Sequence, residues 1–252
     1  MNSLFDLSGQ KALVTGGSGA LGRALVEGLH EAGAEAAICG VSDRAHAVAA
    51  ELGRSGRRAI GLQADLADRE ARRQMFAEAV EQLGGVDILV TAHGLTTRHN
   101  AEDFPLDEWS RTLEVNLTSV FKLCQLAGRH MLPKGRGKIV NIASMLSFSG
   151  GITVTAYAAS KGGVAQITKA LANEWAGRGV NVNAIAPGYF DTPLAAGVKN
   201  DPVRNRQILD RLPAGRWGEP ADLKGAVVFL ASRASDYVHG IILPVDRGWL
   251  AR

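Results

Sequence analysis

The chain has 252 residues and a net charge of only +3, with 46% hydrophobic and 21% charged residues. A chain of this length forms one large domain or two small ones and buries roughly three-quarters of its surface on folding. Its basic residues are dispersed among acids, which argues against nucleic-acid binding, and no apolar run reaches the ~18 residues of a membrane span. The N-terminus lacks a signal-peptide pattern, so we expect a cytoplasmic protein without a membrane or nucleic-acid partner.

The two cysteines and six histidines show no sign of metal chemistry. Cys39 and Cys124 lie inside apolar stretches, where we expect reduced thiols in the core of a cytosolic protein. The histidines lack metal-ligand spacing, so we expect no metal site.

The first predicted unit joins a strand to a helix through a glycine-rich turn. Lys11–Thr15 is a short apolar run, Gly16–Gly22 reads GGSGALG, and the following helix carries Leu21, Leu25 and Leu29 on one stripe. Between a strand and a helix, backbone N–H groups can approach a pyrophosphate because the glycines carry no side chains. An ordinary turn is the alternative interpretation.

Predicted strands and helices then alternate to the C-terminus. The strands read as continuous apolar runs, which is typical of a parallel sheet covered by helices on both faces. We therefore predict a single doubly wound α/β domain over 1–252, with its ligand at the carboxyl ends of the strands. The predicted strands are 11–15, 36–40, 58–63, 86–91, 138–143, 180–185 and 241–245, and the later predicted helices lie within 43–55, 68–83, 109–132, 157–176 and 220–232.

Polar and glycine residues gather at the predicted carboxyl ends of these strands. A core alone does not require them at so many strand ends, so their coincidence with the expected ligand crevice favours a functional site. They are Gly16, Asp65, Ala92-His93-Gly94, Ser144 and Pro187-Gly188.

Tyr157 and Lys161 lie one helical turn apart, and Ser144 precedes the tyrosine by thirteen residues. A free tyrosine titrates near ~10, but a buried ammonium beside it favours the phenolate, so the pair can act as an acid and a base near neutral pH. The Ser144 hydroxyl can hold a substrate oxygen against the phenol. Taken alone, the Tyr-x-x-x-Lys spacing is common, and a solvated helix face explains most such pairs.

Together these pieces resemble the short-chain dehydrogenase/reductase family over nearly the whole chain. The resemblance implies a Rossmann-like fold with a seven-stranded parallel sheet, hydride transfer with NAD or NADP between a secondary alcohol and a ketone, and an oligomer, for which we expect a homotetramer. The matching residues are Thr15-Gly16-x-x-x-Ala20-x-Gly22, Asp65-Leu66, Gly94, Asn116, Ser144, Tyr157-x-x-x-Lys161 and Pro187-Gly188-x-x-x-Thr192.

The resemblance implies a catalytic role for four residues. Tyr157 is expected to be the acid and base, Lys161 to favour its phenolate and hold the nicotinamide ribose, and Ser144 to position the substrate oxygen. Asn116 is expected to interrupt the long helix and seat a water that links Lys161 to solvent. A core amide or a helix end is the alternative interpretation of Asn116.

The second half of the chain resembles a sugar-acid branch of the family, which includes 2-deoxy-D-gluconate 3-dehydrogenase and gluconate 5-dehydrogenase. A sugar acid needs a cation for its carboxylate, and Arg98 is the best candidate, with a solvated loop arginine as the alternative. The resemblance rests on 141–148, 172–176, 181–189, 213–218 and 246–252.

The substrate pocket is expected to have a small lid around 193–211. Met145, Ser147 and Tyr189 are expected to line the pocket below it. The cations of the lid, which are Lys199, Arg204 and Arg206, are expected to be solvated.

The cofactor contacts also follow from the resemblance. Asp65 is expected to bind the adenine amino group, although it also suits a helix N-cap, for which Asp68 is the better candidate. The acid that marks many NAD enzymes and the arginine that marks many NADP enzymes are both missing at Gly40 and Val41, so we expect NAD from the branch alone. The expected contacts are Gly16, Ser18, Leu21, Gly22, Asp65, Leu66, Ala92, Gly94, Tyr157, Lys161, Pro187, Gly188, Phe190 and Thr192.

Two short segments that follow predicted strands depart from the family pattern. After strand four the family usually has Asn-Asn-Ala-Gly, whereas this chain has Thr91-Ala92-His93-Gly94. His93 either fills a neighbouring gap or alters cofactor affinity. Asp246-Arg247-Gly248 replaces Asp-Gly-Gly, and a positive φ at Arg247 would strain the arginine.

Two other functions stay open beside oxidoreduction of a sugar acid such as 2-deoxy-D-gluconate or gluconate. The first is reduction of a simple ketone or a 3-ketoacyl thioester with the same residues. The second is a nicotinamide-binding regulatory protein without turnover, which only Ala92-His93 favours. The complete catalytic set argues against the second function, because a sensor needs no proton path.

Overall fold

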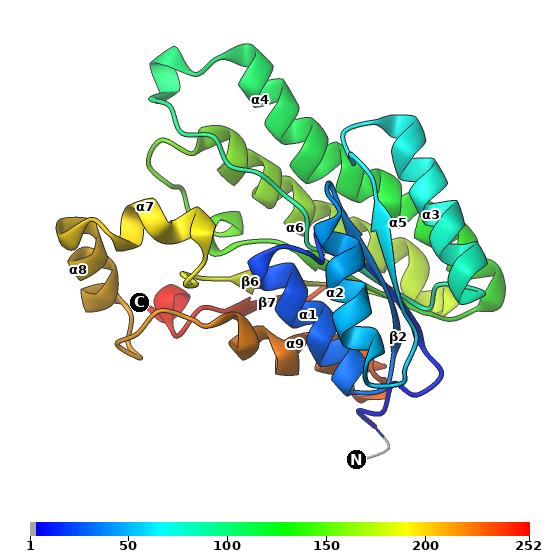
Figure 1. Ribbon diagram of the computed structural model, residues 1–252. Coiled ribbons are helices and arrows are strands. Elements are labelled where there is room, and N and C mark those ends of the chain that lie inside the picture. Colours follow the sequence, from blue (N-terminus) through cyan, green and yellow to red (C-terminus); the bar gives the residue numbers. More distant parts are fainter. Residues whose placement is uncertain (1–3) are drawn as a thin grey trace.

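The computed structural model describes residues 4–252 and contains, within that range, a parallel sheet of seven strands in the order β3-β2-β1-β4-β5-β6-β7 (Figure 1). The predicted doubly wound fold is thus confirmed, and the strand order reverses between β1 and β4, because the chain crosses from β3 at the edge of the sheet to β4 beside β1. The strands are β1 Lys11–Thr15, β2 Glu35–Gly40, β3 Ala59–Gln63, β4 Ile88–Thr91, β5 Gly137–Ile142, β6 Val180–Pro187 and β7 Ile242–Val245.

Helices connect the strands and cover both faces of the sheet (Figure 1). Asp68 caps α3 by accepting a hydrogen bond from the Ala71 N–H at 2.7 Å, as expected of the better cap candidate. No helix in the described range is long and apolar enough to cross a membrane. The helices are α1 Ala20–Glu31, α2 Arg44–Gly53, α3 Arg69–Leu83, α4 Leu106–Leu113, α5 Ser119–Met131, α6 Thr155–Trp175, α7 Ala196–Lys199, α8 Pro202–Arg211 and α9 Lys224–Ala231.

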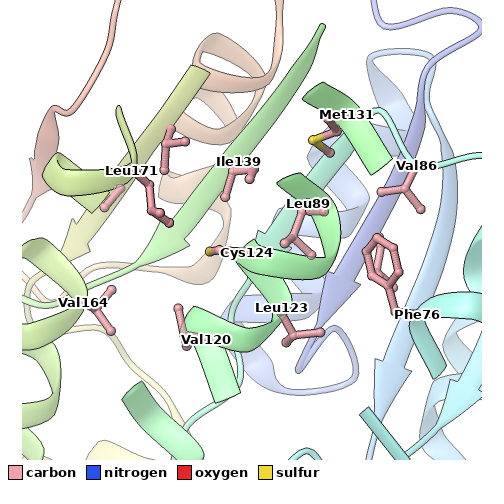
Figure 2. Close-up of a cluster of buried hydrophobic side chains, with 14 of the residues drawn as sticks. Phe76, Val86, Leu89, Val120, Leu123, Cys124, Met131, Ile139, Val164 and Leu171 are labelled. Carbon is pink, nitrogen blue, oxygen red and sulfur yellow. The ribbon is translucent and has the colours of Figure 1, made fainter. Parts of the chain in front are cut away.

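Each face of the sheet has its own apolar core. On one face, Phe76 of α3, Leu123 of α5 and Val164 of α6 pack towards Leu89 of β4 and Ile139 of β5 (Figure 2). Helices α1, α2 and α9 cover the other face. Each large apolar side chain fully buried here stabilises the fold by ~1.5–3 kcal/mol. Both cysteines are buried free thiols, as the apolar runs around them predict.

One turn of π-helix, Glu114–Thr118, divides the long helix that the sequence predicts within 109–132. Helix α4 therefore ends before the turn and α5 begins after it. The wider turn places Asn116 in a fully buried position, where its side chain bonds to the backbone of Leu95. These bonds replace helix interactions that the π turn disrupts.

Helices α7 and α8 stand apart from the sheet (Figure 1), inside the predicted lid segment. A third and smaller apolar cluster lies under them. It joins Ile208 of α8 to Met145 and to Trp249 of the C-terminal turn. The lid segment is therefore attached to the body through both the loop after β5 and the C-terminus.

Arg247, which replaces the glycine usual in the family, has a φ of 56°. The strain expected at this position is thus present. Its Nη2 donates to Asp222 Oδ2 at 2.6 Å, and the same carboxylate accepts from Arg216. These ion pairs hold the strained residue against the start of the segment that leads into α9.

Candidate active site

A cavity of about 550 Å³ opens where the chain leaves β5 and β6. The loop after β4 and helix α8 complete its wall. Among the residues singled out from the sequence, it brings together Leu21, Arg98, Ser144, Met145, Tyr157, Pro187, Gly188, Tyr189, Phe190 and Thr192.

Tyr157 lies in the first turn of α6, at the wall of this cavity. Burial raises its pKa, and a hydrogen bond with the Ser144 side chain offsets that rise only in part. Ser144 is held there as the N-cap of a short 3₁₀ turn, with its Oγ accepting from the Leu146 N–H at 3.1 Å. The phenol is therefore protonated at neutral pH, whereas the sequence led us to expect a pKa shifted towards neutrality.

The side chain of Lys161 is buried one turn further along α6. Its Nζ donates to the Ile142 carbonyl oxygen at 2.7 Å and lies 5.7 Å from the centroid of the Tyr157 ring. Burial lowers the pKa of Lys161 to about 8. Because the ammonium is bonded to the end of β5 rather than to the phenol, the effect of burial dominates the pKa of Tyr157.

Asn116 links the segment after β4 to α6. Its Oδ1 accepts from the Leu95 N–H at 2.9 Å, and its Nδ2 donates to the Leu95 carbonyl at 2.8 Å and to Ser160 Oγ at 3.2 Å. A Cβ on Gly94 would lie 3.2 Å from Asn116 Oδ1 and 3.8 Å from Lys161 Nζ. The amide is satisfied by protein atoms, as a core amide would be, and it adjoins the buried ammonium.

His93 connects β1 to the π turn through a chain of hydrogen bonds. Ser119 Oγ donates to the Val115 carbonyl at 2.5 Å, so it accepts from His93 Nε2 at 2.6 Å. His93 Nδ1 then accepts from Thr15 Oγ1 at 2.7 Å. Burial, and then the charge of Lys161, lower the pKa of His93 to about 3. The residue that departs from the family pattern is thus a neutral imidazole with both nitrogens bonded.

The glycine turn before α1 fits a dinucleotide. Gly19 is the N-cap of α1 and makes no side-chain cap, and the first turn carries no acid, so its N–H groups are open to an anion. Gly16 has a φ of 67°, and a Cβ there would lie 2.6 Å from His93 N. A Cβ on Gly22 would lie 2.1 Å from the Gly16 carbonyl oxygen. A pyrophosphate could therefore approach the backbone of this turn closely, as the sequence predicts.

The segments after β2 and β3 lie beyond this turn. Asp65 is exposed and accepts a hydrogen bond at 2.9 Å from the backbone N–H two residues on, while Leu66 is buried. A Cβ on Gly40 would lie 2.4 Å from Ser18 Oγ. An acidic side chain at this position, where many NAD enzymes carry one, would therefore require the Ser18 hydroxyl to move. Val41 is exposed.

The segment after β6 forms the opposite wall of the crevice. A Cβ on Gly188 would lie 2.7 Å from Asp246 Cα, so this turn packs directly on the C-terminal segment. Phe190 is buried and pairs as a β-bridge with Gly218, and Thr192 starts a 3₁₀ turn. Ala92, on the other side, donates its N–H to the backbone of β1 at 3.0 Å.

Three of the four residues expected to contact the substrate line the cavity, and one does not. Arg98, Met145 and Tyr189 line the cavity. Ser147 lies outside the lining, because its Oγ donates to the Lys161 carbonyl at 2.6 Å and accepts from the Ser144 N–H at 3.3 Å. Its hydroxyl thus supports the start of α6 instead of facing a substrate.

Several lining residues were not singled out from the sequence, or were expected to be solvated. Arg204, Gln207, Ile208 and Arg211 of α8 line the cavity, and so does Trp249. Their spacing of three, four and seven residues along α8 places the first four on one helix face, which is the signal that the sequence contained.

Three comparisons with known proteins cover nearly the whole chain. A family profile described as enoyl-(acyl carrier protein) reductase matches residues 17–250. The chain is 49% identical over 254 residues to the 2-dehydro-3-deoxy-D-gluconate 5-dehydrogenase of Bacillus subtilis, covering 100% of this chain and 99% of that protein.

Solved structures resemble the chain equally closely. The gluconate 5-dehydrogenase of Burkholderia cenocepacia, in complex with NADP and tartrate, has a TM-score of 0.96 and 38% identity, and the match covers 99% of this chain and 98% of that one. An Agrobacterium tumefaciens protein with bound NADP has a TM-score of 0.93 and 47% identity over 100% of both chains. The similarity therefore extends through every segment that builds the cavity.

Proposed function

The chain belongs to the short-chain dehydrogenase/reductase family, and we propose that it interconverts a secondary alcohol and a ketone on a sugar acid by hydride transfer. The observation that supports this most is a half-buried tyrosine phenol beside Ser144 in a cavity that Arg98 also lines. The similar proteins are named for 2-dehydro-3-deoxy-D-gluconate and gluconate. These two acids and 2-deoxy-D-gluconate are the proposed substrates.

The proposed chemistry moves one proton between the substrate oxygen and Tyr157. A bound nicotinamide supplies the hydride acceptor or donor. In oxidation the phenolate of Tyr157 takes the proton of the substrate hydroxyl, and in reduction the phenol returns it to the ketone oxygen. The Ser144 hydroxyl is the second hydrogen-bond partner of that oxygen. Lys161 holds the ribose and, with Asn116, provides the route by which the proton reaches solvent.

The proposed cofactor site runs from the glycine turn to the end of β6. The glycine turn would hold the pyrophosphate, and the segment after β3 would hold the adenine. The nicotinamide half would lie against the ends of β4 and β6 and the start of α6. The residues in these roles are Gly16, Ser18, Leu21, Gly22, Asp65, Leu66, Ala92, Gly94, Tyr157, Lys161, Pro187, Gly188, Phe190 and Thr192.

The preference between NAD and NADP is a separate part of the proposal. The resemblance to the sugar-acid branch favours NAD, whereas the two similar structures described above hold NADP. Asp43 and Arg44, which are both exposed beside Val41, offer an acid to a ribose diol and a base to a 2′-phosphate. Measuring kcat/KM with each cofactor decides this point, and a higher value with NAD is the expected result.

We also propose that residues 193–211 act as a substrate lid and that the protein is a cytoplasmic homotetramer. The lining of the cavity by α8 supports the lid. Leu106 and Tyr237, with exposed fractions of 79% and 100%, support contacts between copies of the chain. The two buried free thiols support a reducing compartment.

A screen of alcohol oxidation with NAD and NADP in parallel tests the proposed function. Gluconate, 2-deoxy-D-gluconate and the matching neutral polyols are compared by the rise in nicotinamide absorbance. We expect turnover of at least one sugar acid and little turnover of the polyols. Inertness towards every sugar acid together with reduction of a 3-ketoacyl thioester would replace this function by the simpler reductase. Cofactor binding by fluorescence without any turnover would favour the regulatory protein.

A further inference from the structure

Three arginines surround the cavity that contains Tyr157. Arg98 comes from the loop after β4, whereas Arg204 and Arg211 come from α8. Burial raises the pKa of Tyr189, and the charges of all three arginines lower it, so the three groups act on the same side chain. Segments far apart in the sequence thus bring their positive charges to one place.

The cations of the lid segment fall into two groups. Arg206 pairs with Asp210 at 2.9 Å, and Lys199 pairs with Asp191. In contrast, no acidic side chain between residues 4 and 252 forms an ion pair with any of the three cavity-lining arginines. The unpaired cations are the ones that face the cavity.

The geometry of α8 explains this division. Asp201 caps the helix by accepting from the N–H groups of Val203 and Arg204 at 2.9 and 3.1 Å. Ile208, buried in the cluster under the helix, fixes which face turns inward, and Arg204 and Arg211 lie four residues before it and three after it. The Arg206–Asp210 pair lies elsewhere around the helix.

Arg211 is also oriented by an aromatic ring. Its Cζ lies 4.1 Å from the centroid of the Trp249 ring. Stacking of this kind holds a guanidinium plane in place while leaving its N–H donors free for a carboxylate. Trp249 of the C-terminal turn therefore holds the guanidinium of Arg211 in place at the cavity.

Like charges gathered without acids repel one another, and an anionic ligand removes that repulsion. Ser144 and Tyr157 line the cavity from the end of β5 and the start of α6, whereas Arg204 and Arg211 line it from α8. A ligand that spans both ends has a hydroxyl or ketone at Tyr157 and an anionic group at the lid.

We propose that Arg204 and Arg211 bind the carboxylate of the substrate from α8, together with Arg98, so that the lid itself selects an anionic sugar over a neutral one. The reaction at Tyr157 rests on the proposed function, whereas the anion site rests on the three unpaired arginines.

The test compares Arg204→Ala and Arg211→Ala with Arg206→Ala, a matched control on the same helix. Kinetics are measured with gluconate and with its neutral counterpart, glucitol. Loss of a charge-assisted hydrogen bond raises KM for gluconate about 10-fold or more in each cavity variant, with kcat and the glucitol kinetics little changed. Arg206→Ala leaves both substrates within about twofold. Equal KM values in the cavity variants and the control would overturn the proposal.

A second measurement separates this site from the reaction. Isothermal titration calorimetry of the protein loaded with the reduced nicotinamide, which cannot accept a hydride from an alcohol, gives the affinity for gluconate and for glucitol without turnover. We expect the wild type to prefer gluconate and both cavity variants to lose that preference, and Arg211→Lys to recover only part of it because lysine does not stack in the same way. This result without any turnover would refute the proposed function and leave the anion site standing. Turnover of gluconate, together with an unchanged preference for gluconate over glucitol in both variants, would support the proposed function and refute the anion site.

Discussion

The proposed role of Tyr157 predicts that the two directions of the reaction respond differently to pH. Burial raises the pKa of this phenol, so the phenolate needed for oxidation is a minor species near neutrality. We expect kcat/KM for alcohol oxidation to rise up to about tenfold per pH unit between about pH 7 and 10, with no such rise for ketone reduction. Initial rates in both directions over this range check the prediction. An oxidation rate that does not change with pH would contradict it.

His93 makes the folded protein sensitive to acid. Its pKa is lowered to about 3 by burial and by the charges of Lys161 and Arg72, whereas an unfolded histidine titrates near ~6.5. Between these values only the unfolded chain binds the proton, so the free energy of unfolding falls as pH falls, by at most ~1.4 kcal/mol per pH unit.

Replacing His93 by asparagine should remove this contribution. Urea unfolding of the wild type and of His93→Asn at pH 7.5 and pH 4.5 measures the change in each protein. We expect a smaller loss of stability in His93→Asn over that interval, whatever its stability at pH 7.5. Equal losses in the two proteins would show that the imidazole does not stay neutral in the folded chain.

Helix α6 carries two adjacent glycines with opposite surroundings. A Cβ on Gly162 meets nothing within 4 Å, whereas a Cβ on Gly163 would lie 2.7 Å from Leu117 Cδ1 in the π turn. Gly162→Ala should therefore stabilise the fold by ~0.5–1 kcal/mol through helix propensity and the lower entropy of the unfolded chain. Gly163→Ala should be less stable than Gly162→Ala, because the end of the Leu117 side chain must move to make room for the new methyl group.

Chemical denaturation of both variants provides the comparison, and each serves as the control for the other. Gly163→Ala should also lower turnover more than cofactor affinity, since Leu117 adjoins Asn116 in the π turn. Equal stabilities of the two variants would mean that α6 does not pack on the π turn as the structure shows.

Elements with a regular period were predictable from the sequence. The apolar strands and the glycine turn were located to within two residues because a parallel sheet buried on both faces leaves continuous apolar runs. The π turn was not predictable as such, because it depends on Asn116 meeting the backbone of Leu95, twenty-one residues earlier. The family resemblance indicated only that the helix is interrupted there.

At the level of the whole molecule, the parts that were missed depend on the meeting of distant segments. The partners of His93 come from β1 and α5, and the arginines of the cavity come from the β4 loop and α8. Ser147 was expected to line the pocket, but its hydroxyl donates to the Lys161 carbonyl in α6. Sequence spacing placed Tyr157 and Lys161 on one helix and left these contacts undetermined.

The assembly of the molecule is a prediction of its own. Leu106 and Tyr237 are exposed apolar side chains. Burying them between copies of the chain removes apolar surface from water, which favours association. We expect light scattering after size exclusion to give four times the 26.6 kDa mass of the chain. A single species at the mass of one chain would contradict the homotetramer.

The proton transfer assigned to Tyr157 is tested most directly by gluconate oxidation with Tyr157→Phe, which keeps the ring and removes the hydroxyl. We predict that kcat falls about 10²–10⁴-fold while the dissociation constant of the cofactor, measured by nicotinamide fluorescence, changes less than about threefold. Turnover by Tyr157→Phe within about tenfold of the wild type, with the cofactor still bound, would contradict the account.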